Sequence, residues 1–111
     1  MKKASGSTKV AALFEAAADY ITVNGWLSDD AGFDGSARSI DGAMNSVLDC
    51  IDSDVEKALA VGHDACRVFE DIVGSNVCHW NDLTCKDGAE AERMLRALAG
   101  VLNGGAIPVA A

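Results

Sequence analysis

The tripeptide Trp80-Asn81-Asp82 carries the most distinctive polar chemistry in this sequence. Asparagine and aspartate side chains readily accept hydrogen bonds from neighbouring backbone N–H groups, and an adjacent tryptophan can anchor such a turn in the core. We therefore interpret the tripeptide as a structural turn between two helices. The functional alternative is a pocket for a small molecule or nucleotide, in which Trp26 or Trp80 forms a stacking floor and Asn81 and Asp82 orient the ligand.

A nucleotide would also need cationic side chains in that pocket. Arg93 and Arg96 are three residues apart in a segment that we expect to be helical, so they share one face of it. Two solvated arginines are the simpler interpretation. The complete candidate pocket set is Trp26, Trp80, Asn81, Asp82, Arg93 and Arg96.

Cysteine and histidine side chains offer a third possibility, a structural zinc site with nitrogen and sulfur ligands. The residues concerned are His63, Cys66, Cys78, His79 and Cys85. Their spacing fits no specific zinc pattern, and the sequence does not decide whether they cluster in space. A nucleophilic Cys85 paired with His79 would lack an oxyanion motif and a third orienting group. We therefore predict no metal, no cofactor, no catalytic residues and no enzymatic activity.

Acidic residues are concentrated in one part of the chain. The sequence has 17 Asp and Glu against 9 Lys and Arg, a formal net charge of −8 at pH 7. Between positions 29 and 56 the only basic residue is Arg38, and the acids are Asp29, Asp30, Asp34, Asp41, Asp49, Asp52, Asp54 and Glu56. A solubilising surface is one interpretation, and a face that docks a basic partner is the other. The few scattered cations disfavour direct nucleic-acid binding.

Residues 30–41 also show part of the spacing of a calcium-binding loop, with Gly35 at the sharp turn. Arg38 brings a positive charge into that loop, and Asp41 is shorter than the glutamate that usually closes it. We interpret the segment as a plain acidic loop.

The composition predicts one all-α domain. A chain of 111 residues that is 50% hydrophobic and 5% aromatic fits a single core of small, closely packed helices better than a β-sandwich. We expect a bundle of about four helices over residues 1–111, with a long acidic loop after the first. The core is expected at about 8–103, with flexible termini at 1–6 and 104–111.

Apolar periodicity predicts the first two helices. The first spans about 8–24, with Ser7 or Thr8 as its cap and Gly25 as its stop. A loop follows at 25–36, and the second helix spans about 38–51. The apolar stripe of the first helix is Val10, Leu13, Phe14, Ala17 and Ile21.

Two capping-box spacings predict the later helices. Ser53 and Glu56 start a helix that runs to about 73, unbroken or with a pause near Gly62, and Gly74-Ser75-Asn76 ends it. Asp87 and Glu90 start the last helix, which ends at about 102. The expected core residues of the third helix are Ala58, Leu59, Cys66, Phe69, Ile72 and Val73.

No stretch approaches the roughly 20 apolar residues of a membrane span, and no apolar run follows Lys2 and Lys3 as a signal peptide would require. We predict a cytoplasmic protein without membrane contact and with reduced thiols.

Short motifs resemble those of an uncharacterised family of short proteins from actinobacteria and their phages. They are Ala16-Ala17-Ala18-Asp19-Tyr20-Ile21 followed by Gly25-Trp26, then Val77-Cys78-His79-Trp80-Asn81-Asp82, and the capped start Asp87-Gly88-Ala89-Glu90. The resemblance spans roughly residues 10–102. Asp87 stands where relatives usually have threonine, and residues 29–41 match poorly. The resemblance implies a helical fold and a phage or mobile-element setting, and it carries no activity.

Together these observations predict a small acidic accessory protein that binds a host macromolecule without catalysis. The expected partner is a host protein with a basic surface in the host-cell cytoplasm, and inhibition of a host defence system would fit. The sequence does not decide whether the protein forms a homodimer. The alternative from a different class is a small-molecule or nucleotide-sequestering protein that uses the Trp/Asn/Asp pocket.

Overall fold

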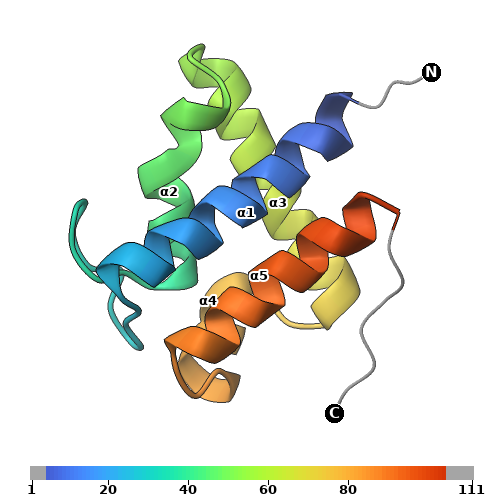
Figure 1. Cartoon of the computed structure of the whole chain (residues 1–111). Helices are drawn as coiled ribbons and strands as arrows, with labels where there is room; N and C mark the ends of the chain where they lie inside the picture. The colour runs from blue at the N-terminus through green and yellow to red at the C-terminus, as the bar shows by residue number, and fades with distance from the viewer. Residues whose placement is uncertain (1–4, 105–111) are drawn as a thin grey trace.

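The computed structural model describes residues 5–104 and shows an all-helical domain (Figure 1). The five α-helices of this range are α1 (Ser5–Asn24), α2 (Ile40–Ile51), α3 (Val55–Val73), α4 (Val77–His79) and α5 (Gly88–Leu102). A π-helical turn, η1 (Trp80–Thr84), continues α4. The described range contains no β-strand, only isolated bridges of Arg38 with Trp26 and Gly32. The all-α prediction is confirmed, but α4 and η1 occupy a segment that was expected to be a loop.

Helix α1 lies at the centre of the core. It packs most extensively along α5 and also contacts α2 and α3 (Figure 1). The radius of gyration is 13.0 Å, as expected for one compact domain of about 100 residues. The predicted stripe of α1 is confirmed, because all five of its members are buried: Val10, Leu13, Phe14, Ala17 and Ile21.

The predicted stop signals are also confirmed. Gly25 has φ +99° and its N–H donates to the Ile21 carbonyl at 2.8 Å, while Gly74 has φ +86° and ends α3. Both are left-handed conformations that glycine adopts without steric cost. At α5, the Asp87 carboxylate accepts the Glu90 N–H at 2.8 Å. The Glu90 carboxylate accepts the Lys86 N–H at 2.7 Å, so the two side chains cap the helix reciprocally.

Three predicted helix starts are wrong by one or more residues. Helix α1 already begins at Ser5, so Ser7 and Thr8 do not cap it. Helix α2 begins at Ile40 behind Ser39, whose side chain accepts the Gly42 N–H. The cap of α3 is Asp54 instead of Ser53, because the Asp54 carboxylate accepts the Lys57 N–H at 3.1 Å. The starts of α2 and α3 therefore lie where a side chain accepts a free backbone N–H in three dimensions.

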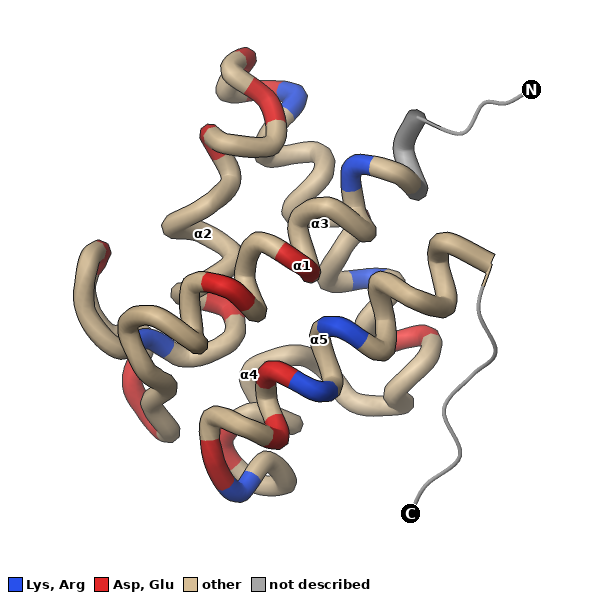
Figure 2. Tube along the Cα trace, viewed as in Figure 1, with Lys and Arg blue, Asp and Glu red and all other residues tan. Residues whose placement is uncertain are grey.

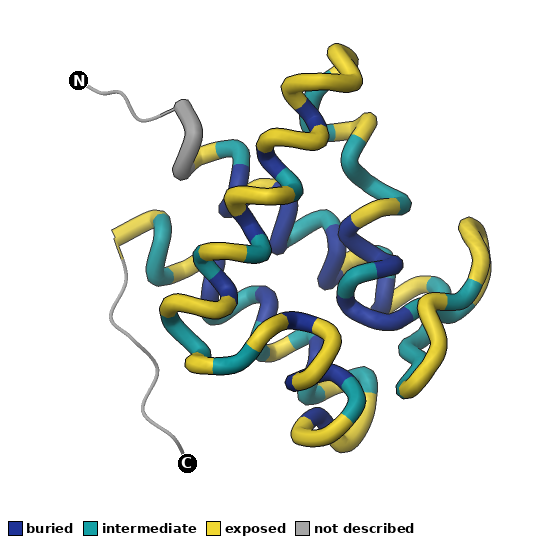
Figure 3. Tube along the Cα trace, turned by 180° about the vertical axis from the view of Figure 1, so that it is seen from behind, coloured by how far each residue is buried: buried dark blue, intermediate teal, exposed yellow. Residues whose placement is uncertain are grey.

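Helix α3 runs unbroken through Gly62, but its first turns are poorly covered. Ala58 and Phe69 are buried as predicted, whereas Leu59 is 49% exposed, which corrects the prediction that it belongs to the core. Helix α2 ends at Ile51, and the turn that joins it to α3 stands at the edge of the molecule (Figures 1 and 3). No other described element covers Leu59 there.

The prediction of flexible termini falls largely outside the described residues. Within them, residues 5 and 6 belong to α1 and not to a loose terminus. None of the helices in the described range is long and apolar enough to cross a bilayer.

Candidate functional site

A groove of about 430 Å³ lies between the loop after α1, the outer face of α2 and the first turns of α3. We call it the α2–α3 groove. Its lining residues are Asp34, Arg38, Asn45, Ser46, Leu48, Asp49, Asp52, Ser53, Val55, Ala58 and Leu59. Apolar side chains form its floor on the α3 side, where Val55 is 72% exposed. Three predicted acids line it, so the groove combines apolar surface with carboxylates.

The three carboxylates of the groove differ in their partners. Asp52 forms an ion pair with Lys9 at 2.6 Å and accepts the Asp54 N–H at 2.9 Å. The Lys9 ammonium and that backbone N–H hold the pKa of the Asp52 carboxyl below its usual value. Asp34 and Asp49 are exposed and have no ion pair with any described residue. These two carboxylates are available to a cationic partner.

The remaining predicted acids lie in the loop after α1, in α2 and at the start of α3, and Figure 2 marks acidic positions along these segments. Asp54 is used as the cap of α3, and Glu56 is exposed in the first turn of that helix. Asp29 and Asp30 lie in the exposed loop. Asp41 lies in the first turn of α2 and is half-buried, and its charge contributes to the raised pKa of the Cys66 and Cys78 thiols. Of the eight predicted acids, Asp34, Asp49 and Asp52 line the groove, and the role of the acidic segment as a binding face stays a prediction.

The loop after α1 is fastened to the helices. The Tyr20 hydroxyl donates to the Ser36 carbonyl at 2.6 Å and accepts the Gly35 N–H at 2.9 Å. The Arg38 guanidinium donates to the Ala31 carbonyl at 3.0 Å and to the Ser46 hydroxyl at 2.7 Å. These bonds fix the segment that carries Asp34.

Phe33 and Val55 are surface residues that the sequence reasoning missed. Phe33 is 82% exposed and directly precedes Asp34 at the rim of the groove. An aromatic side chain between acids in a glycine-rich loop was the available signal for Phe33. Large exposed apolar side chains beside charged ones are a common feature of protein interfaces.

Asn81 is buried and connects three parts of the chain. Its Oδ1 accepts the Trp26 indole N–H at 2.7 Å and the Ile40 N–H at 3.0 Å. Its Nδ2 donates to the Leu27 carbonyl at 3.0 Å and to Asp82 Oδ1 at 2.8 Å. These four bonds use both donors and both acceptor positions of the amide. We call this set, Trp26, Leu27, Ile40, Asn81 and Asp82, the Asn81 junction.

Asp82 and Trp80 complete the same structural arrangement. Asp82 accepts the backbone N–H of Asp29 at 2.8 Å, which holds Asp29 at φ 65°, a left-handed conformation uncommon outside glycine. The Asn81 amide and the Asp29 N–H keep the pKa of the Asp82 carboxyl below its usual value. Trp80 packs edge-on against Phe69 with ring centroids 5.8 Å apart. The tripeptide therefore does what the structural interpretation predicted, and its residues do not line the α2–α3 groove.

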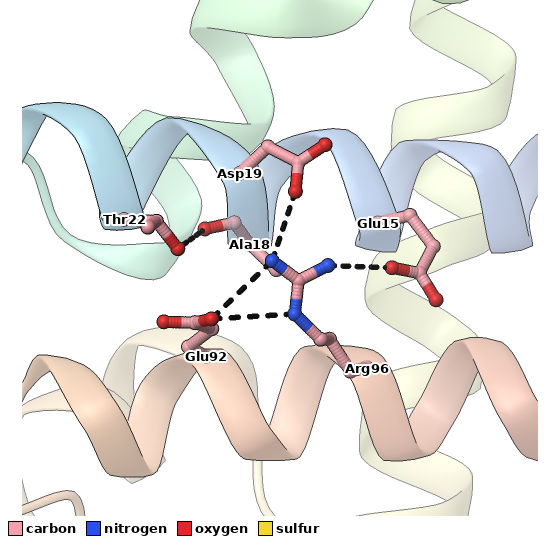
Figure 4. Close-up of polar contacts among 6 residues, drawn as sticks. All are labelled: Glu15, Ala18, Asp19, Thr22, Glu92 and Arg96. Carbon is pink, nitrogen blue, oxygen red and sulfur yellow. Dashed lines mark hydrogen bonds and ion pairs between the residues drawn. The ribbon is translucent and has the colours of Figure 1, made fainter.

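Arg96 joins α5 to α1 and does not face the Asn81 junction. Its guanidinium donates to Glu15 at 2.7 Å, to Asp19 at 2.8 Å and to Glu92 at 3.3 Å (Figure 4). The Asp19 and Glu15 carboxylates raise the pKa of Arg96. Arg93 is exposed. The structure thus commits Arg96 to carboxylates of α1 and α5, away from the tryptophans and Asn81 with which the candidate pocket grouped it.

The candidate zinc residues do not assemble within the described range. No group of three or more His, Cys, Asp or Glu residues there could hold a metal ion, and this includes the acidic segment 30–41. Burial, together with Asp41, raises the pKa of the Cys66 and Cys78 thiols. Burial raises the pKa of Cys85 to about 11, and its thiol donates to the Asp87 carbonyl at 3.2 Å. All four cysteines are free thiols.

Fold and site together define a small all-helical protein whose distinctive surface is the α2–α3 groove. A family model matches residues 5–101, so the chain belongs to DUF6197, a family of unknown function. Comparison with curated proteins and with solved structures gave no match. The expected membership of a family without known activity is confirmed. Origin in actinobacteria or their phages, and the proposed family motifs, stay predictions.

Proposed function

We propose that this protein acts by non-catalytic binding of a protein with a basic surface, and that the α2–α3 groove is the binding face. The observation that carries the proposal is the pair Asp34 and Asp49, whose carboxylates are exposed beside uncovered apolar side chains and have no described ion-pair partner. Opposite charge on the partner would steer the encounter, and apolar contact would add affinity. In a phage or mobile-element setting the partner would be a host protein, such as a component of a host defence system.

The alternative proposal, a small-molecule or nucleotide binder built on Trp26, Trp80, Asn81 and Asp82, has less support. Every hydrogen-bonding group of Asn81 is already used within the protein, and Arg96 is held by three carboxylates. A ligand at this position would have to break those bonds before it could form its own.

Charge reversal at the groove tests the proposal. Asp34→Lys with Asp49→Lys removes the two free carboxylates, whereas Asp52 and Asp54 are unsuitable because they hold an ion pair and a helix cap. Glu70→Lys with Asp71→Lys is the matched control, since both residues are exposed in the last turns of α3 and the net charge changes equally.

Each immobilised variant is exposed to host-cell lysate at low and high salt, and retained proteins are identified by mass spectrometry. We expect a basic protein that the parent and the control retain, that the groove variant loses, and that added salt releases. Equal retention of every such protein by the groove and control variants would contradict the proposal.

A further inference from the structure

The groove has an apolar floor that is partly exposed to solvent. Ala58 and Leu59 lie about one helical turn after Val55 on α3, and Leu48 of α2 also lines the groove. Val55 and Leu59 are 72% and 49% exposed, although both sit in ordered helix beside the core. A patch of this kind, rimmed by polar side chains, is characteristic of an interaction surface.

The walls of the groove determine how a partner can bind. Beyond their first turns, the backbone groups of α2 and α3 are bonded within the helices, and the described residues contain no strand whose edge could accept a further strand. An extended peptide would therefore leave its own N–H and C=O groups without partners against the apolar floor. A helix satisfies its own backbone and presents only side chains, so a helix is the form that fits.

The charge at the rim of the groove indicates which side chains a partner must carry. Asp34 and Asp49 rim the groove on the loop and α2 sides, and Glu56 is exposed at the start of α3. A second copy of this chain would bring a formal net charge of −8 against the same charge, which opposes self-association. Lysine and arginine side chains complement this rim.

We propose that the α2–α3 groove receives one face of a basic amphipathic helix of a partner protein. The apolar side chains of that helix contact Leu48, Val55 and Leu59, and its lysine or arginine side chains lie near Asp34 and Asp49. The volume of about 430 Å³ takes the few side chains of one helix face and leaves the rest of the helix outside. This inference rests on the proposed function and specifies the partner element.

The test uses a fluorescein-labelled Leu/Lys peptide of about 18 residues, or five turns, with all leucines on one helix face. A control peptide has the same composition in scrambled order, so its charge is equal but it has no apolar face. Val55→Ser with Leu59→Ser removes the floor without changing charge. Val23→Ser with Leu83→Ser is the matched control, because these side chains are 80% and 70% exposed outside the groove.

Fluorescence anisotropy gives the affinities, and thermal melting shows that each variant is folded. We expect the amphipathic peptide to bind the parent about tenfold or more tightly than the scrambled one, since burial of leucine side chains adds affinity. The groove variant should lose this preference, and the control variant should keep it within about twofold.

Two results would overturn the inference. The first is that the parent binds the two peptides with equal affinity, and that Asp34→Lys/Asp49→Lys weakens both while Glu70→Lys/Asp71→Lys weakens neither. The groove would then bind a basic partner through charge alone, so the proposed function would hold without a helix. A dimer of the protein by itself that dissociates in the Val55→Ser/Leu59→Ser variant, measured by sedimentation, would make the groove a contact between copies. If Asp34→Lys/Asp49→Lys binds each peptide with the same affinity as Glu70→Lys/Asp71→Lys, the proposed function is contradicted as well.

Discussion

The Asn81 junction and the α2–α3 groove both gather polar side chains, but they use them differently. In the junction, the buried Asn81 amide bonds to four groups of the protein, and Asp82 holds the loop backbone at Asp29. In the groove, Asp34 and Asp49 are exposed, and no described residue pairs with them. The conspicuous tripeptide therefore positions the loop, while less distinctive residues on that loop and on α2 are free to meet a partner.

The largest difference in unfolding free energy between the two regions should appear when an asparagine is removed from each of them. Asn81→Ala leaves the Trp26 indole, the Ile40 N–H and the Leu27 carbonyl without their partner, so unfolding free energy should fall by about 3 kcal/mol or more. Asn45→Ala in the groove should change it by less than about 0.5 kcal/mol. Urea denaturation followed by circular dichroism measures both. A loss below about 1 kcal/mol for Asn81→Ala would break the comparison.

A smaller loss of stability is expected where Arg96 of α5 bonds to Glu15 and Asp19 of α1, an arrangement that we call the clamp. Arg96→Met removes bonds to three carboxylates, but the guanidinium is more than a third exposed, so screening limits the loss to about 1 kcal/mol. The loss should shrink in 1 M salt. Arg93→Met, at an exposed position on the same helix, is the control. Equal stability of the two variants at low salt would show that the clamp contributes nothing.

The free energy of unfolding should also depend on pH through Asp82 of the junction. Its pKa is lowered in the folded protein, so its stabilisation is complete above the ordinary carboxyl value of about 4 and is lost as the pH falls through the lowered pKa. Asp82→Asn removes this titration while Asp52 still titrates. Between about pH 5 and pH 2 the parent should lose more stability than the variant. A steeper acid loss in the variant would contradict the assignment.

The smallest effect on folding is expected in the groove. Val55→Ser with Leu59→Ser should change the free energy of unfolding by less than about 1 kcal/mol, because both side chains are largely in solvent already. Thermal denaturation measures it beside Val23→Ser with Leu83→Ser. A loss as large as that of Asn81→Ala would mean that the groove floor belongs to the core.

Local patterns predicted most of the helices. The stripe of α1, the stops at Gly25 and Gly74, and the cap formed by Asp87 and Glu90 depend on residues within a few positions, and the structure confirms them. The π-helical turn η1 could not be predicted in this way. Its buried residue Asn81 bonds to Trp26, which is 55 residues away in the chain, and local patterns do not show such a contact.

The candidate sites were harder to predict than the helices. The sequence identified Asp34 and Asp49 as acids of one region, but it could not show that Asp52 pairs with Lys9, 43 residues away, or that Arg96 bonds to α1. Leu59 fits a helical apolar stripe as well as any core residue. Its exposure depends on which elements pack against the first turns of α3, and periodicity does not encode that packing.

Amide resonances of the two regions provide the most direct test of the account. The isotope-labelled protein is titrated with the amphipathic Leu/Lys peptide, and ¹H–¹⁵N spectra are recorded at each step. We predict shifts that cluster at Asn45, Asp49, Val55 and Leu59, while the Trp26 indole and the Asn81 side-chain amide stay in place. Shifts centred on the Trp26 indole and Asn81, with an unchanged groove, would contradict the assignment of binding to the groove and of structure to the junction.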